Sequence, residues 1–294
     1  TRICRLFGMT RQAYYQQGWS MQSVCVEEEL IVQEVLKIRQ HHRAMGTRKL
    51  YEKLQLFMLD HQIKMGRDAL FDVLQCHNLL VRRNKRRVYT TQSFHRYHKY
   101  PNLIKGFIPT AINQLWVSDI TYWKIGEKFV YISFITDAYS HKIVGYHVSK
   151  TLETYGSLQA LKMALSGFIE EPTKHFKLVH HSDRGVQYCS DEYVNLLQKN
   201  NIQISMTQSG DPLENAMAER INGILKEEYL QFYDVENIEQ ATAYLKHAVD
   251  LYNNDRPHLS IGLLTPNTIH QNKQIKTEKL WKNKSQNRTI VNLF

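Results

Sequence analysis

Three runs rich in β-branched and aromatic residues follow one another between residues 114 and 150. They constrain the fold more than any other feature of the chain. They read QLWVSDITYW, KFVYISFITDAY and HKIVGYHVSK, and only short turn-forming segments separate them, which predicts consecutive antiparallel strands. The patterns that follow are a helix near 158–169, an apolar strand ending at Asp183, a helix over 193–197, the strand IQISM and a long helix beginning near Pro212. Strands in a meander followed by alternating helices and strands predict an α/β fold built on a mixed sheet.

The first eighty residues have helical periodicity instead. Residues 1–17 carry two short helical patterns separated at Gly8, with Thr10 as an expected N-cap. Longer helical patterns follow over 27–42, 46–58 and 66–80. Helix, short turn and helix beside basic residues is the layout of a helix-turn-helix DNA-binding domain. An ordinary small helical bundle is the alternative.

The net charge of +10 is unevenly distributed. Residues 1–107 hold 19 Lys and Arg against 8 Asp and Glu, residues 108–270 hold 13 against 19, and residues 271–294 hold 6 against 1. Basic ends predict contact with a polyanion, and an acidic middle predicts chemistry that needs carboxylates. The segment VRRNKRRVYTTQSFHRYHKY interleaves basic with aromatic residues, which favours a linker along DNA phosphates over a solvated run of charge.

Composition disfavours several other classes of protein. A hydrophobic content of 43% is too high for a disordered chain. No run approaches eighteen apolar residues and no hydrophobic leader is visible, so we expect neither a membrane span nor a signal peptide. The four cysteines are widely spaced without a CxxC pair, which favours reduced thiols in a cytosolic protein over disulfides or a zinc site.

One carboxylate stands in an unusual place. Asp183 ends the apolar strand and lies in HHSDRGVQY, between two histidines and an arginine. A lone aspartate there is most often a helix cap or a turn residue, whereas a metal ligand needs partners. Asp119, inside the first strand, is one such partner, because adjacent strands can bring two carboxylates together and a divalent cation offsets their repulsion. The helix near Pro212 can supply a third ligand, from Glu214, Glu219, Glu227 or Glu228.

Four segments in order resemble the DDE transposase and retroviral integrase superfamily, with its ribonuclease H-like fold. The closer resemblance is to the second-frame transposases of the IS3 family of bacterial insertion sequences. The segments read WVSDITY, HHSDRGVQYCS, ENAMAERINGILKEE and YNNDRPHLSIGLLTP, and residues 46–83 resemble that family's N-terminal helical region. Asp119 and Asp183 have 63 residues between them, and Glu219 follows with 35 between. The family commonly has Asp-Asn where this chain has Glu214-Asn215, which leaves the role of Glu214 open.

The resemblance implies an enzyme that binds insertion-sequence ends, cleaves a 3′ end and transfers it to another DNA strand. Two Mg²⁺ ions, which Mn²⁺ can replace, would be held by Asp119, Asp183 and Glu219 and would activate water or a 3′-hydroxyl. The implied partners are double-stranded DNA, as terminal inverted repeats and as target, and further copies of the chain in a homodimer or larger oligomer. No membrane is involved. The implied location is the bacterial cytoplasm, on the nucleoid when DNA is bound.

The expected DNA contacts fall into three groups. Lys226 lies seven residues after Glu219 on the same helical face and can hold a phosphate, with a solvated surface lysine as the alternative. His181 and Arg184 flank Asp183 and are candidates for DNA contact or for packing. The basic candidates in the helical region and linker are Arg48, Lys49, Arg67, Arg82, Arg83, Lys85, Arg86 and Arg87.

Two acidic residues are expected to have structural roles. Asp137 ends the strand in FITDAY and has the position of a hairpin-turn residue. Asp211-Pro212 predicts a helix start, which makes Glu214 the third helical residue, where its carboxylate reaches back to the cap. Glu219 would then lie about one and a half turns further in, aligned with Asn215, Asn222 and Lys226. We therefore expect Glu219 to complete the trio.

These patterns divide the chain into five segments. They are an N-terminal helical segment (1–24), a helix-turn-helix domain (25–81), a basic aromatic linker (82–107), a ribonuclease H-like integrase catalytic core (108–270) and a basic tail (271–294). Two other functions remain open. The basic helical region and tail disfavour a ribonuclease H-like nuclease that only hydrolyses, and the intact acidic trio disfavours a domesticated DNA-binding protein with an inactive site.

Overall fold

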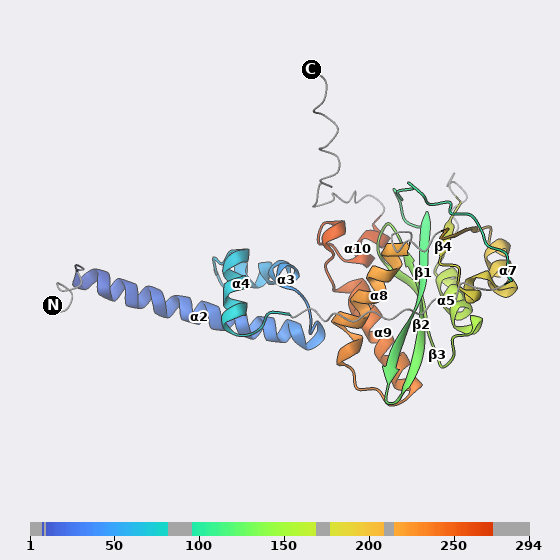
Figure 1. Cartoon of the computed structure of the whole chain (residues 1–294). Coiled ribbons are helices and arrows are strands. Elements are labelled where there is room, and N and C mark those ends of the chain that lie inside the picture. The colour runs from blue at the N-terminus through green and yellow to red at the C-terminus, as the bar shows by residue number, and fades with distance from the viewer. Residues whose placement is uncertain (1–7, 9, 82–95, 169–176, 209–214, 273–294) are drawn as a thin grey trace, which may run out of the picture. The chain divides into compact units, whose positions relative to one another are not determined.

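The computed structural model describes residue 8 and residues 10–81, 96–168, 177–208 and 215–272 of the chain. The chain forms two compact units, residues 1–83 and residues 84–294 (Figure 1). Most of the expected basic linker and almost all of the expected basic tail lie outside the described residues. Within the described ranges, we find no helix whose length and apolar character would let it cross a membrane.

In its described part, the first unit consists of three helices, α2 (Arg11–His41), α3 (Thr47–Asp60) and α4 (Arg67–Cys76). Thr10 caps α2 as predicted, since its hydroxyl accepts a hydrogen bond of 3.0 Å from the Ala13 N–H. The expected break at Gly8 agrees with the turn at that residue, and the first of the two expected patterns lies outside the described residues. The second pattern continues beyond residue 17 as part of one long helix. The single helix α2 also continues across the expected boundary between residues 24 and 25. Its sequence contains one glycine and no proline, and one glycine costs only about 1 kcal/mol, too little to end a helix of this length.

A small apolar core holds this unit together. α3 buries Leu50, Leu54 and Met58, and α4 buries Leu70, Val73 and Leu74. Among the described residues, the buried cluster is Ile31, Val35, Met45, Leu50, Leu54, Met58, Ile63, Leu70 and Leu74. The unit is therefore a folded helical domain in which α3 and α4 are joined by a short turn.

The second unit is built on one five-stranded sheet. Its strands are β1 (Leu115–Ile125), β2 (Lys128–Asp137), β3 (Ile143–Ser149), β4 (Val179–Ser182) and β5 (Gln203–Met206). The strand order is β3-β2-β1-β4-β5, with β1, β2 and β3 antiparallel and both β4 and β5 joined in parallel. The predicted antiparallel meander and mixed sheet of a ribonuclease H-like α/β core are confirmed.

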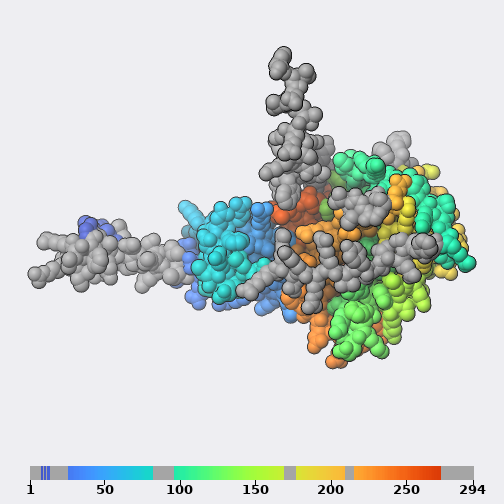
Figure 2. Space-filling model, in the orientation of Figure 1, coloured from blue at the N-terminus to red at the C-terminus, as the bar shows by residue number. Residues whose placement is uncertain are grey.

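Helices cover both faces of this sheet (Figure 1). One face packs against α5 (Thr154–Ser166), α6 (Val186–Cys189) and α7 (Asp191–Lys199), and the other against α8 (Ala216–Glu228) and α9 (Ile238–Asn254). The chain then passes through α10 (Pro266–Gln271), and two short 3-10 turns, η2 (Leu230–Phe232) and η3 (Leu259–Ile261), lie along this part. Strand alternation divides the side chains of β1 between the two cores, so Trp116 packs on the α5 side and Trp123 on the α8 side. In Figure 2 the surface of the β1–β2 hairpin adjoins that of the helices α8 and α9.

The structure describes the helix that carries Glu219 from its N-cap onward. α8 starts at Ala216, with Asn215 as its N-cap residue. The expected helix start at Asp211-Pro212 and the position of Glu214 lie outside the described residues. Glu219 lies in the first turn of α8. The Asn215 side chain, which donates to the Ser118 carbonyl at 3.2 Å, holds the start of this helix against β1.

Candidate active site

The parallel pairing of β1 with β4 brings two aspartates together. Residues 115–117 of β1 pair with residues 179–181 of β4. Two residues further along this register, Asp119 comes opposite Asp183, which directly follows the last residue of β4. Both side chains are half-buried. A carboxylate inside a strand and another at a strand end thus meet because the two strands run in the same direction.

Hydrogen bonds hold both carboxylates. Asp119 Oδ1 accepts from the Ile120 N–H at 2.9 Å, and Asp119 Oδ2 accepts from Asn222 Nδ2 at 2.7 Å. Asp183 Oδ1 accepts from the Gly185 N–H at 2.9 Å. A Cβ atom at Gly185 would lie 2.9 Å from Gln187 Oε1 and 3.0 Å from the same carboxylate oxygen, so a side chain added here would require these two side-chain ends to shift.

The electrostatics of Asp119 reflect this crowding. Burial, then the charge of Asp183 and that of Glu219, raise the pKa of Asp119 to about 8, against the hydrogen bonds from Ile120 and Asn222. Like charges this close repel, and a divalent cation with oxygen ligands is the usual remedy. Among the described residues, no three His, Cys, Asp or Glu side chains already form a metal-binding cluster. Asp119 and Asp183 are therefore the assembled part of the site, and Glu219 is an exposed neighbour on α8.

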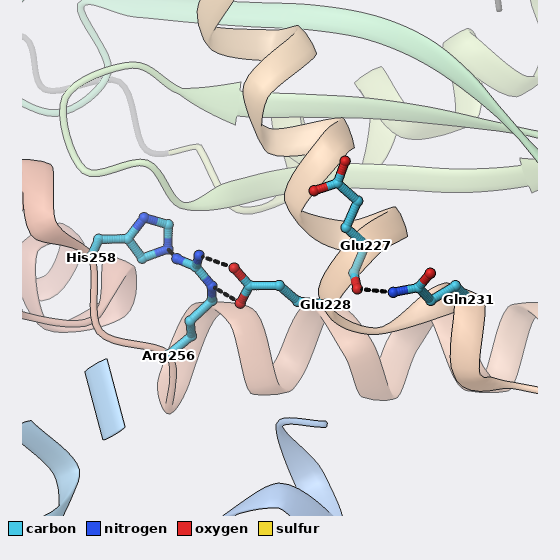
Figure 3. Close-up of polar contacts among 5 residues, drawn as sticks. All are labelled: Glu227, Glu228, Gln231, Arg256 and His258. Atoms are coloured by element: carbon cyan, nitrogen blue, oxygen red, sulfur yellow. Dashed lines mark hydrogen bonds and ion pairs between the residues drawn. The ribbon is translucent and has the colours of Figure 1, made fainter. Parts of the chain in front are cut away.

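Two other candidate glutamates have different surroundings (Figure 3). Glu228 forms a bidentate ion pair with Arg256, whose NH2 and Nε donate to the carboxylate at 2.6 and 2.7 Å. Glu227 is exposed, and its backbone carbonyl accepts a hydrogen bond from the Gln231 side chain. Because Glu228 is bound to a buried arginine, it is not available to complete the acidic trio.

Lys226 lies near Asp119. Its Nζ sits 3.7 Å from the centre of the Tyr122 ring, a cation–π arrangement. Burial lowers the pKa of Lys226, and the neighbouring charge of Asp119 opposes that shift. The alternative of a fully solvated surface lysine is thus wrong, and Lys226 is a half-buried cation close to Asp119.

His181 is not placed to touch DNA. Its side chain is fully buried, and Nδ1 lies 2.9 Å from Ser205 Oγ on β5. Of the two expected roles of His181, packing agrees with this burial and DNA contact does not, because β4 lies between β1 and β5 and is covered on both faces. Arg184, beyond the strand, is half-buried and stays a prediction.

Sequence reasoning did not identify the polar groups that support the aspartates. His180 Nε2 lies 2.7 Å from Ser118 Oγ and 2.9 Å from Tyr193 OH, so a buried hydrogen-bonded cluster joins β1, β4 and α7. Burial, and then the neighbouring His181, lower the pKa of His180 to about 3, so this imidazole is neutral. The sequence places Asn222 on the same helical face as Glu219, and this spacing is the sequence feature that could have indicated its contact with Asp119.

The remaining predicted residues have the following positions. Asp137 has the expected turn role: its carboxylate accepts from the Ser140 N–H, the Ser140 hydroxyl and the Asn113 N–H at 2.7 to 2.8 Å. In the first unit, Arg48 and Arg67 are exposed and Lys49 is half-buried. The residues Arg82, Arg83, Lys85, Arg86 and Arg87 lie outside the described residues.

This chain is similar to known family models, to curated proteins and to solved structures. Two family models, both described as integrase core domain, match residues 109–212 and 200–266. The insertion element IS600 uncharacterized 31 kDa protein of Shigella sonnei is 31% identical over 268 residues, covering 90% of this chain and 96% of that protein. The transposase for insertion sequence element IS629, also of Shigella sonnei, is 32% identical over 227 residues, covering 77% and 74%. A solved structure of the HTLV-2 integrase catalytic core domain in complex with magnesium is 18% identical, with a TM-score of 0.41, and the match covers 54% of this chain and 97% of that one.

Proposed function

Because this chain belongs to the DDE transposase and integrase superfamily, and within it to the IS3 type, we propose that Asp119, Asp183 and Glu219 are its catalytic acidic trio. The chain is a transposase, a polynucleotidyl transferase that integrates DNA. The observation that carries the assignment is the β1–β4 register, which sets Asp119 opposite Asp183 beside the helix that bears Glu219. The ion pair of Glu228 with Arg256 supports the choice of Glu219 over Glu228.

The donor set fits magnesium. Carboxylate oxygens are the hard ligands that Mg²⁺ prefers. Burial first, and then the charges of Asp183 and Glu219, raise the pKa of Asp119, and a bound divalent cation would favour its ionised form. We infer that Asp119, Asp183 and Glu219 hold two Mg²⁺ ions, which Mn²⁺ can replace. When bound, the ions supply Lewis-acid activation of water or a 3′-hydroxyl and stabilise the charge of an in-line displacement.

The other residues of the chain bind and orient DNA in this proposal. Lys226, held against the Tyr122 ring, can contact a phosphate near the aspartates. The helical unit with Arg48, Lys49 and Arg67, the basic segment over 82–87, and Arg184 bind element ends and target DNA. Two element ends must be joined in one reaction, which favours a homodimer or larger assembly in the bacterial cytoplasm.

The experiment compares Asp119→Asn, Asp183→Asn and Glu219→Gln with the natural chain on labelled element ends in Mg²⁺. We expect each variant to abolish cleavage while end binding stays nearly intact, because the basic segments supply most of the affinity. Glu227→Gln, an exposed change on the same helix, is the matched control and should stay active.

The products separate the possible functions. Joined strands support transposition, cut strands without joining indicate a nuclease, and a mobility shift without any chemistry indicates a DNA-binding protein. Binding lost in parallel with cleavage, in variants that stay folded, would contradict the assignment. A folded but inert Glu214→Gln variant, beside an active Glu219→Gln variant, would reverse the choice of glutamate.

A further inference from the structure

Two buried asparagines of α8 reach consecutive residues of β1. Asn215 and Asn222 are seven residues apart and therefore lie on one helical face, two turns from each other. They are 7% and 5% exposed. Asn215 Nδ2 donates to the Ser118 carbonyl at 3.2 Å, and Asn222 Nδ2 donates to Asp119 Oδ2 at 2.7 Å. Both hydrogen bonds join the helix to the strand, but only the one from Asn222 is accepted by a carboxylate of the proposed trio.

The hydrogen bond from Asn222 restrains the orientation of the Asp119 carboxylate. Within the described ranges, its two donors are the Ile120 N–H on Oδ1 and Asn222 on Oδ2. The first comes from the next residue of the same strand, so it moves with Asp119. The second comes from a different element and ties the carboxylate to the helix that bears Glu219, three residues earlier.

The Asn222 amide presents its nitrogen to Asp119. This orientation suits the ionised carboxylate that a metal ion would bind, because an ionised carboxylate only accepts hydrogen bonds. The amide oxygen Oδ1 is then buried without a hydrogen-bond partner among the described residues. An unsatisfied buried acceptor destabilises the fold, and the neighbouring buried positions Ile221 and Leu225 are apolar. Stability by itself would favour an apolar residue at position 222 as well.

We propose that Asn222 is a positioning residue that holds the Asp119 carboxylate in the orientation required for Mg²⁺ binding and sets its place relative to Glu219. The proposal rests on the proposed function, because it gives Asn222 a role toward the metal ligands. Partners that orient a metal-binding side chain typically change metal affinity by roughly 10–100-fold when removed.

The test uses the full chain without DNA and measures the rise in Tm as Mg²⁺ is added. Asn222→Ala removes the donor, and Asn222→Leu removes it while keeping a side chain of similar size. Asn215→Ala is the matched control, since it removes an equally buried asparagine on the same helix that contacts only a backbone carbonyl. The Mg²⁺ concentration for half-maximal strand cleavage is measured in parallel.

We expect both Asn222 variants to need roughly 10–100-fold more Mg²⁺ for half of the full rise in Tm and for half-maximal cleavage. Asn215→Ala should lower the Tm without changing either Mg²⁺ concentration. Should Asn222→Leu respond to Mg²⁺ like the natural chain, Asn222 only packs and the inference is overturned.

An Asp119→Asn variant separates this inference from the proposed function. If it keeps the full Mg²⁺ response, the proposed metal site itself fails. If it loses that response while Asn222→Leu keeps it, the metal site stands and only the role of Asn222 fails.

Discussion

The buried ion pair between Glu228 and Arg256 permits a quantitative test of how the helices of the second unit are held together. The two side chains are 16% and 3% exposed and are joined by two hydrogen bonds of 2.6 and 2.7 Å. Arg256 also lies 2.8 Å from His258 Nε2. Burial lowers the pKa of Arg256, but the Glu228 carboxylate outweighs burial and raises it overall, so the guanidinium stays charged. The perturbation is Glu228→Gln, which removes the negative charge with almost no change in shape.

The expected loss of stability follows from the charge of Arg256, which the variant leaves buried without its partner. Removing one partner of a buried pair costs about 3–5 kcal/mol because the remaining charge is uncompensated. Glutamine still offers one acceptor oxygen, so we expect the lower end, about 3 kcal/mol. That is a large part of the roughly 5–15 kcal/mol by which a domain is stable. For a domain of about 150–250 residues, 1 kcal/mol shifts the Tm by about 2–4 °C, so the expected decrease is about 6–12 °C.

The assay is thermal unfolding of the full chain, followed by tryptophan fluorescence, to which the buried Trp116 and Trp123 of the second unit contribute. Glu227→Gln is the control, and as an exposed substitution it should change stability by less than about 0.5 kcal/mol. The double variant Glu228→Leu with Arg256→Met removes both charges and should recover much of the loss. A Glu228→Gln variant as stable as the control would refute the reasoning, because the pair would then be solvated or compensated elsewhere.

The remaining predictions concern pH, packing and salt. Burial, and then the charge of Arg256, lower the pKa of His141 to about 4, whereas an unfolded histidine titrates near 6.5. The stability that this group contributes is complete above pH 6.5 and is lost as the pH falls toward 4. His141→Asn removes the titrating group, and asparagine suits the local φ of +64°. In urea titrations over a pH series, the free energy of unfolding of this variant should therefore decrease less with acid than that of the natural chain. Gly145→Ala should cost at least about 1–3 kcal/mol, because its Cβ would lie 2.1 Å from the Ala160 carbonyl oxygen; an unchanged urea midpoint would contradict this. Neutralising the five basic residues within 82–87 should flatten the slope of log K against log salt by about 4 units, and an unchanged slope would mean that this segment does not touch DNA.

The sequence by itself determined the sheet and the two aspartates. Three β-rich runs separated by short turns have few arrangements other than an antiparallel meander, because short connections pair consecutive strands. Asp119 and Asp183 were identifiable because each carboxylate interrupts or ends an apolar strand. The uneven distribution of charge along the chain could likewise be read from the sequence alone. All of these are local properties, set by side chains within a few positions of one another.

The tertiary structure decided what each neighbouring polar residue does. Four glutamates in or near one helix cannot be told apart from the sequence. The structure distinguishes Glu228, because Arg256, 28 residues further along the chain, forms an ion pair with it. His181 and Arg184 both flank Asp183, but only the position of β4 between two strands shows that His181 is buried. The contact of Asn222 with Asp119 joins residues 103 positions apart. Local periodicity gives the face on which a side chain lies, whereas its partner depends on which distant element packs against that face.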